Sequence, residues 1–331
     1  MKHAFDVRFL FRSVLALSCL HATNCTGEDM GDPSRHLLYQ NESLHDYRQA
    51  IEAAEPRTFG ALLANSLLIT ATSAQTFRDP HAPDLYILQW LLVWRGIRAI
   101  FQQIQRTALP STGLAQLFHR PSMNLKEAAK HIPQDLISLI MSIPPRDPEI
   151  LCQDAYLHGL KYLGSLYQNL REGGLGPVMR LRIITWFTFL PSRLVELFRE
   201  RRGRALVILA HYAVFLKLTA GVWWLVGVGN RSLRDICKHL GPAWRFALDV
   251  PLRAISIEDT TELARLVLGD PFWGSRRSPV GTEVADQERE TKQLGLVDDE
   301  GRPICLSEDA ATVVLAEPSE PGEEPVWHID K

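Results

Sequence analysis

The sequence contains few cysteines, and none of them is spaced as a metal site would require. The five are Cys19, Cys25, Cys152, Cys237 and Cys305. No two form a C-x-x-C pair and no histidine cluster accompanies them, although structural zinc sites need closely spaced thiolates and imidazoles. We therefore expect no metal site, and we interpret the cysteines as packing residues in a reducing compartment.

Uninterrupted apolar runs of membrane-spanning length are also missing. Residues 205–228 are long enough to cross a bilayer, but His211, Tyr212 and Lys217 interrupt them. A lysine at mid-membrane costs roughly 2.5–3.5 kcal/mol, so a buried helix of a helical bundle is the better interpretation. The apolar N-terminus is interrupted by Arg12 and lacks a good cleavage site. We expect neither a membrane span nor an export signal.

Motifs of common enzyme classes are absent as well. The sequence has no Gly-x-Ser-x-Gly elbow, which argues against a hydrolase of that type, and no glycine-rich phosphate loop followed by Lys-Ser or Lys-Thr. Strands are not indicated either, since no run of apolar and polar alternation ends in an Asn-Gly or Asp-Gly hairpin signal.

Charge is distributed unevenly along the chain. The formal net charge is −2, but residues 281–331 carry 14 acidic and four basic residues. This tail has too little apolar content to offset its ordering entropy, so we predict that it is disordered. The remainder is mildly basic, which falls far short of the concentrated positive charge of a nucleic-acid-binding surface.

The remaining pattern has helical periodicity nearly throughout. It predicts helices over residues 4–22, 34–51, 59–70, 84–106, 149–171, 183–201 and 205–225, with a loop-rich connector at 107–150. Leu37, Leu44, Tyr47 and Ile51 are expected to share the buried face of the second helix, and Leu151 to lie in the core. The fold class is therefore all-α, with a multi-helix domain over 1–256 and an extension over 257–331 that is mostly a disordered acidic tail.

The sequence from residue 205 onward resembles a known family. It contains the motif Ala-Leu-x-x-Leu-Ala-His-Tyr over residues 205–212, then Trp223-Trp224 and Gly227-Val228-Gly229. Upstream, residues 14–22 and Leu92-Val93-Trp94-Arg95-Gly96 match further family segments in the expected order. The chain thus resembles the C-terminal regulatory domain of fungal zinc-cluster transcription factors, especially those similar to sterol uptake control proteins. The resemblance spans roughly residues 3–256 and implies the same helical fold.

Several positions depart from the family pattern. Val228 stands where a tryptophan is usual, and Gly203 replaces a common proline. More important, the family's DNA-binding module holds two zinc ions with six closely spaced cysteines, and this sequence has no such array. The resemblance therefore implies a regulatory domain lacking its zinc cluster. We expect no direct binding of nucleic acid by these residues.

Four residues are candidates for a ligand site. His211 and Tyr212 would place polar groups in an otherwise apolar pocket, as ligand pockets require. Trp224 would line a cleft while its neighbour packs in the core, and Trp94 belongs to an aromatic stripe with Trp90. Ordinary core packing is the alternative for each of them. We expect no cofactor and no metal at this site.

The resemblance implies a transcription-regulator-like protein in the nucleus or cytoplasm, with a role in secondary metabolism. It would sense an apolar small molecule, or bind a second copy of itself or another transcription factor. The alternative is a noncanonical class I-type terpene cyclase of a fungal biosynthetic pathway, in which Mg²⁺ would be the cofactor. Such an enzyme needs clustered carboxylates, whereas Asp46, Asp84 and Asp154 are isolated and Asp298-Asp299-Glu300 lies in the predicted tail.

Overall fold

The computed structural model describes residues 6–25, 35–53, 55–105, 123–219, 221–274, 304–306 and 313–315. Within these ranges the chain is helical, apart from two short antiparallel strands, β1 (Ile304–Leu306) and β2 (Val313–Leu315). The predicted all-α class is therefore confirmed. The predicted disordered acidic tail lies outside the described residues, except for β1 and β2.

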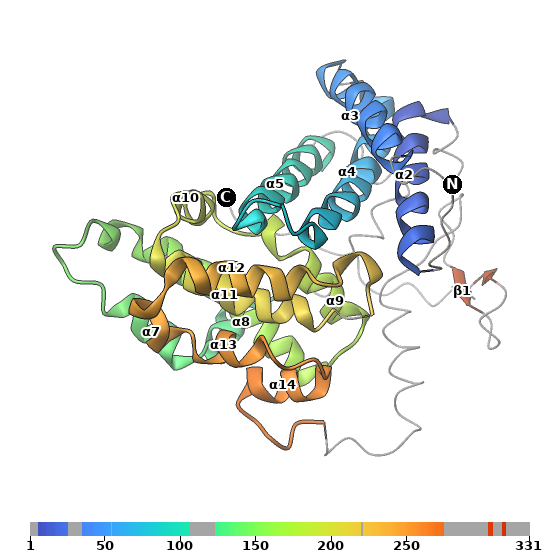
Figure 1. Cartoon of the computed structure of the whole chain (residues 1–331). Coiled ribbons are helices and arrows are strands. Elements are labelled where there is room, and N and C mark those ends of the chain that lie inside the picture. Colours follow the sequence, from blue (N-terminus) through green and yellow to red (C-terminus); the bar gives the residue numbers. More distant parts are fainter. Residues whose placement is uncertain are drawn as a thin grey trace.

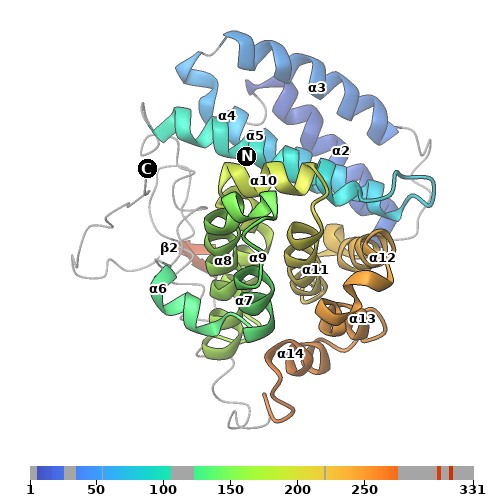
Figure 2. The same cartoon turned by 90° about the vertical axis from the view of Figure 1, so that its left-hand side faces the viewer.

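The N-terminal helices form one layer, in the upper part of Figures 1 and 2. They are α2 (Arg8–Cys25), α3 (Arg35–Ala53), η1 (Pro56–Thr58), α4 (Phe59–Ser73), η2 (Ala74–Arg78) and α5 (Tyr86–Gln105). α2 packs along α3, and α4 packs against both α2 and α5. The four long helices correspond to the first four predicted ones, with shifts of a few residues at their ends.

The remaining helices form the lower and larger part of the molecule (Figure 2). They are α6 (Leu125–Ala128), η5 (Ala129–His131), α7 (Gln134–Met141), η6 (Pro148–Cys152), α8 (Gln153–Glu172), α9 (Pro177–Ile184), η7 (Trp186–Thr188), α10 (Ser192–Arg199), α11 (Gly203–Lys217), η8 (Trp223–Leu225), α12 (Val228–Leu240), η9 (Pro242–Ala247), α13 (Asp249–Ala254) and α14 (Thr260–Leu268). α14 follows the proposed boundary at residue 256 and packs on α13 and α8.

Helix α11 is the centre of this part. Every residue from Ala205 to Leu216 is buried, and α7, α8, α9, α10, α12 and α13 all pack against the helix. A helix that is apolar on all sides is stable only when it is surrounded in this way. With 15 residues α11 is shorter than the roughly 20 needed to cross a bilayer. None of the helices in the described residues is long and apolar enough to span a membrane.

Lys217 is the last residue of α11, and its side chain is hydrogen-bonded to α13. Its side chain is 6% exposed, and Nζ donates to the carbonyls of Ala254 at 2.6 Å and Ile255 at 3.2 Å. Burial lowers the pKa of Lys217, while nearby Glu258 opposes that shift. The lysine that interrupts the apolar run in the sequence therefore satisfies main-chain groups at the end of a neighbouring helix.

Similar contacts join the N-terminal layer to the rest of the fold. Arg95 and Arg98 of α5 donate to the carbonyl of Leu190, at 3.1 and 3.0 Å. In the reverse direction, Arg231 of α12 donates to the carbonyl of Ala82 at 3.0 Å. The two parts are thus connected by guanidinium groups on main-chain acceptors, in addition to apolar packing between α5 and η7.

The predicted buried face of α3 is confirmed for Tyr47 and wrong for Leu37 and Ile51. Leu37 is 50% and Ile51 41% exposed, whereas the residues that α3 buries are Ser43 and Tyr47. Ser43 Oγ lies 2.7 Å from Ser13 Oγ and donates to the Phe9 carbonyl. Because these hydroxyls satisfy each other, the helix packs on α2 through a small polar contact that apolar periodicity does not detect.

Two further predictions fail where a helix is broken. Leu151 is 89% exposed. It lies in the 3-10 turn η6, before α8 begins at Gln153, so it does not share the buried face of the α8 helix. The predicted helix over 183–201 is divided among the end of α9, η7 and α10. Pro191 cannot lie inside a helix, and it stands at the start of α10 instead. The α8 helix ends at Glu172, one residue after the predicted end, and Gly174 follows with a φ of 73°.

Candidate functional site

Tyr212 lies in a buried group of aromatic rings. Its ring stacks on Trp186 at 4.1 Å and lies 4.8 Å from Phe187. The hydroxyl donates to the carbonyl of Ile183, at the end of α9, at 2.8 Å. Burial raises the pKa of Tyr212 well above its ordinary value, so the phenol stays neutral. Tyr212 is therefore a core residue with a satisfied hydroxyl.

Trp94 belongs to the same group. It is 1% exposed and meets Trp90 edge to face at 5.7 Å, while Trp90 meets Phe187 at 5.9 Å. Rings from α5, η7 and α11 thus form one aromatic cluster: Trp90, Trp94, Trp186, Phe187 and Tyr212. Two of the predicted site residues, Trp94 and Tyr212, are brought together by this cluster.

The aromatic cluster contains polar groups that its neighbours do not satisfy. The indole N–H groups of Trp94 and Trp186 are buried and find no acceptor within the described ranges, whereas Trp90 donates to the Thr70 carbonyl at 3.1 Å. Buried donors normally find a partner. These two N–H groups are the polar atoms of the cluster that have no hydrogen-bond partner among the described residues.

His211 lies on another side of α11. Nε2 donates to the carbonyl of Ala247 at 3.2 Å, and because a carbonyl can only accept, Nδ1 is the acceptor for the Tyr167 hydroxyl at 3.4 Å. Burial lowers the pKa of His211 to about 4, with the Ala247 hydrogen bond opposing the shift. At neutral pH His211 is therefore an uncharged connection between α8, α11 and η9.

Trp224 is separate from the aromatic cluster. It is half-buried in η8, whose helical turn packs on α2, η2 and α4. Its neighbour Trp223 lies 4.9 Å from the ring of His21, and Arg78 donates to the Trp223 carbonyl. The tryptophan pair therefore lies where the N-terminal layer meets the rest of the fold. Gly227 follows it and caps the start of α12.

A cavity of about 170 Å³ lies elsewhere, between the first turn of α9, the segment after α11 and the start of α14. Its walls combine the apolar side chains of Leu175, Met179 and Leu218 with Arg180, Thr260 and two glycines. None of the four predicted site residues lines it. The α9 helix nevertheless connects the two places, since Met179 is one turn before the Ile183 carbonyl that holds Tyr212.

Carboxylates are not gathered into a metal site in the part of the chain that is described. No three His, Cys, Asp or Glu side chains there lie close enough to hold an ion. Asp46 pairs with Arg12 at 2.6 Å and Asp84 with Lys238 at 3.0 Å, while Asp154 is exposed in the first turn of α8. The acidic cluster Asp298-Asp299-Glu300 lies outside the described residues. The Mg²⁺ of the cyclase alternative remains a prediction.

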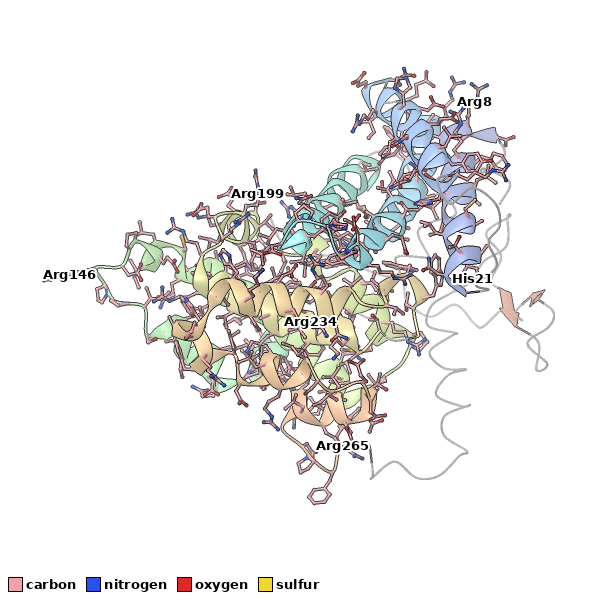
Figure 3. The ribbon with its side chains drawn as sticks, in the orientation of Figure 1. Arg8, His21, Arg146, Arg199, Arg234 and Arg265 are labelled. Carbon is pink, nitrogen blue, oxygen red and sulfur yellow. The ribbon has the colours of Figure 1, made fainter. Side chains whose placement is uncertain are left out.

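Basic side chains are spread over the surface. The labelled arginines Arg8, Arg146, Arg199, Arg234 and Arg265 come from different elements and lie at widely separated points in Figure 3.

Comparison with known proteins supports the resemblance. The chain is 22% identical over 307 residues, 86% of its length, to a Zn(2)-C6 fungal-type transcription factor of Gibberella zeae. It is 20% identical over 218 residues, 64% of its length, to the Zn(2)-C6 fungal-type transcription factor afumD of Aspergillus fumigatus. The resemblance to fungal zinc-cluster transcription factors is confirmed. These matches cover 58% and 57% of the two relatives, so the chain spans less than two thirds of their length.

No family model and no solved structure matches the chain. Its 331 residues hold five dispersed cysteines, which cannot form the six-cysteine array of a zinc cluster. The similarity to the sterol uptake group in particular remains a prediction.

Sequence patterns did not reveal the cavity. Its lining comes from three segments that are far apart in the sequence, and four of the residues in these walls (Gly176, Arg180, Gly221 and Thr260) follow no apolar periodicity. The partners of His211 were also missed, because one of them is the carbonyl of Ala247, and a main-chain acceptor leaves no signal in the residue type.

Proposed function

We propose that this chain is a helical regulatory module of a transcription regulator, acting by binding a small molecule or a protein partner. The observation that carries the proposal is the similarity to two zinc-cluster transcription factors, one of which covers 86% of the chain. The all-α fold is consistent with it. Because fold alone does not fix function, the proposal depends on this similarity rather than on the helical architecture.

The geometry favours a binding role over a catalytic one. Tyr212 and His211 are neutral, and among the described residues no carboxylate is hydrogen-bonded to either of them to activate it as an acid or base. The aromatic cluster offers two unmatched indole donors in an apolar setting, which suits recognition of a mostly apolar molecule with one acceptor. His211, Tyr212, Trp94 and Trp224 therefore remain our proposed ligand-responsive residues. From the similarity to transcription factors we also propose that the protein is located in the nucleus or cytoplasm and that a second copy of this chain is a binding partner.

A tethering experiment tests the regulatory function. The full chain is fused to a DNA-binding domain of unrelated fold and expressed in yeast with a reporter gene bearing that domain's site. We expect the fusion to raise or lower reporter expression severalfold relative to the DNA-binding domain alone. The matched control carries Ala210→Asp, which places a charge in the packed centre of α11 and disrupts the fold. Equal expression from the fusion, the control and the bare domain would contradict the proposal.

A further inference from the structure

The cavity at the first turn of α9 differs chemically from the aromatic cluster. Its apolar walls come from Leu175, Met179 and Leu218, of which Met179 is 1% and Leu218 5% exposed. Its polar lining residues are Arg180 and Thr260. The side chains of both carry hydrogen-bond donors, and no Asp or Glu is among the lining residues.

Arg180 supplies a positive charge at this cavity. Its side chain is exposed, and within the described residues it has neither a hydrogen bond nor an ion pair with a carboxylate. The guanidinium lies flat over Gly221: a Cβ atom built on that glycine would be 3.7 Å from Cζ and Nη2. These distances are ordinary van der Waals contacts, so the guanidinium packs against the backbone at Gly221. Planar guanidinium groups bind carboxylates through two parallel hydrogen bonds.

The size of the cavity limits the ligand. At about 170 Å³ it slightly exceeds the ~150 Å³ cavity that is known to hold a single benzene ring. A single ring or a short aliphatic chain fits, provided that its charged end reaches Arg180.

We propose that this cavity binds a small carboxylic acid with an apolar body, such as an aromatic acid of one ring. The carboxylate pairs with Arg180 and accepts from Thr260, while the ring packs on Met179, Leu218 and Leu175. The inference rests on the proposed regulatory function for its biological meaning, since it assigns a ligand class to that function. Ligand binding at Met179 is one helical turn from Ile183, whose carbonyl holds Tyr212, so α9 links the cavity to the aromatic cluster.

Benzoate is the probe for this site. The purified full chain is titrated with benzoate by ligand-observed NMR, and we expect a Kd on the order of 1 mM for so small a ligand. Benzamide, which has the same ring but no charge, is expected to bind at least about tenfold more weakly because it lacks the charge-assisted pair. Acetate, which has the charge but no ring, is expected to bind more weakly than benzoate because it makes no contact with the apolar walls.

Two arginine variants locate the site. Arg180→Gln is expected to weaken benzoate binding about tenfold or more. Arg146→Gln makes the same charge change at the far edge of the molecule near α7 and is expected to leave the affinity unchanged (Figure 3). Both side chains are exposed, so neither variant disturbs the core. Gly221→Val, which displaces the guanidinium, is expected to reproduce the loss seen in Arg180→Gln.

Two results would overturn the proposal: no benzoate binding to the wild-type chain up to about 10 mM, or equal effects of Arg180→Gln and Arg146→Gln. The titration uses no reporter gene, so its failure would leave the regulatory function standing. Conversely, benzoate binding together with an inactive reporter fusion would preserve the site and remove the proposed function.

Discussion

The carboxylate of Asp235 accepts the main-chain N–H of Leu85 at 3.1 Å, although the two residues are 150 positions apart. Leu85 precedes α5 with a φ of 59°, a left-handed conformation that costs a non-glycine residue about 1–2 kcal/mol. Arg231 donates to the same carboxylate at 3.0 Å and to the carbonyl of Ala82. One ion pair on α12 therefore fixes the loop that leads into α5.

Removing this carboxylate should loosen the joint between the two parts of the fold. We expect Asp235→Ala to lower the free energy of unfolding by about 2–4 kcal/mol, because it leaves Arg231 without its partner and Leu85 without its acceptor. Urea unfolding followed by circular dichroism measures the change. The control is Asp249→Ala, which removes an exposed pair with Arg253 and should cost less than about 1 kcal/mol. Equal losses in the two variants would contradict the assigned role of Asp235.

His211 should make the stability of the fold depend on pH. Its pKa is lowered to about 4 by burial, so the unfolded chain, with a histidine pKa of about 6.5, binds the proton more readily. Its contribution is therefore complete above about pH 6.5 and is lost as the pH falls toward 4. Between about pH 7.5 and pH 4 the wild type should lose about 3 kcal/mol more than His211→Gln. Parallel loss in both proteins would show that another group is responsible.

The ring of Trp244 explains why position 203 is a glycine. A Cβ atom at position 203 would overlap the indole ring of Trp244, so the proline common in the resembled family cannot fit beside this tryptophan. We expect Gly203→Pro to destabilise the protein by about 1–3 kcal/mol through overpacking. In the Trp244→Ala background the same substitution should cost much less, which a double-mutant cycle measures. Additive effects of the two changes would refute this coupling.

The cyclase alternative has a direct assay. The purified chain is incubated with farnesyl diphosphate and Mg²⁺, and volatile products are measured by gas chromatography with a known terpene cyclase as the positive control. We expect no hydrocarbon, because Asp46 and Asp84 are engaged in surface ion pairs. Formation of a cyclic hydrocarbon by the wild-type chain would establish the alternative.

Apolar periodicity predicted the long helices because they bury wide apolar faces, and it failed where polar groups decide the packing. The α3 helix shows this: Ser43 is buried through hydroxyl contacts while Leu37 remains exposed. Leu92 of α5 is likewise 45% exposed, because Trp90 and Trp94 occupy the core instead.

The candidate site was predictable only in part. Tyr212 and Trp94 could be placed in one buried region from their apolar surroundings, and the structure joins them through Trp90 and Phe187. The separation of Trp224 from them depends on the path of the chain after α11, which no local pattern encodes. The Arg180 cavity depends likewise on how α9, α11 and α14 meet.

The contacts of Lys217, Arg95 and Arg231 share a property with consequences for divergence. Each cation is satisfied by a main-chain carbonyl, at Ala254, Leu190 and Ala82 respectively. Every amino acid supplies such a carbonyl, so the residue opposite the cation can be exchanged over evolutionary time without deleting the bond. Only the basic residue and the path of the backbone need to persist. A scaffold joined in this way tolerates extensive sequence drift, which is compatible with the 20–22% identity that separates the chain from its relatives.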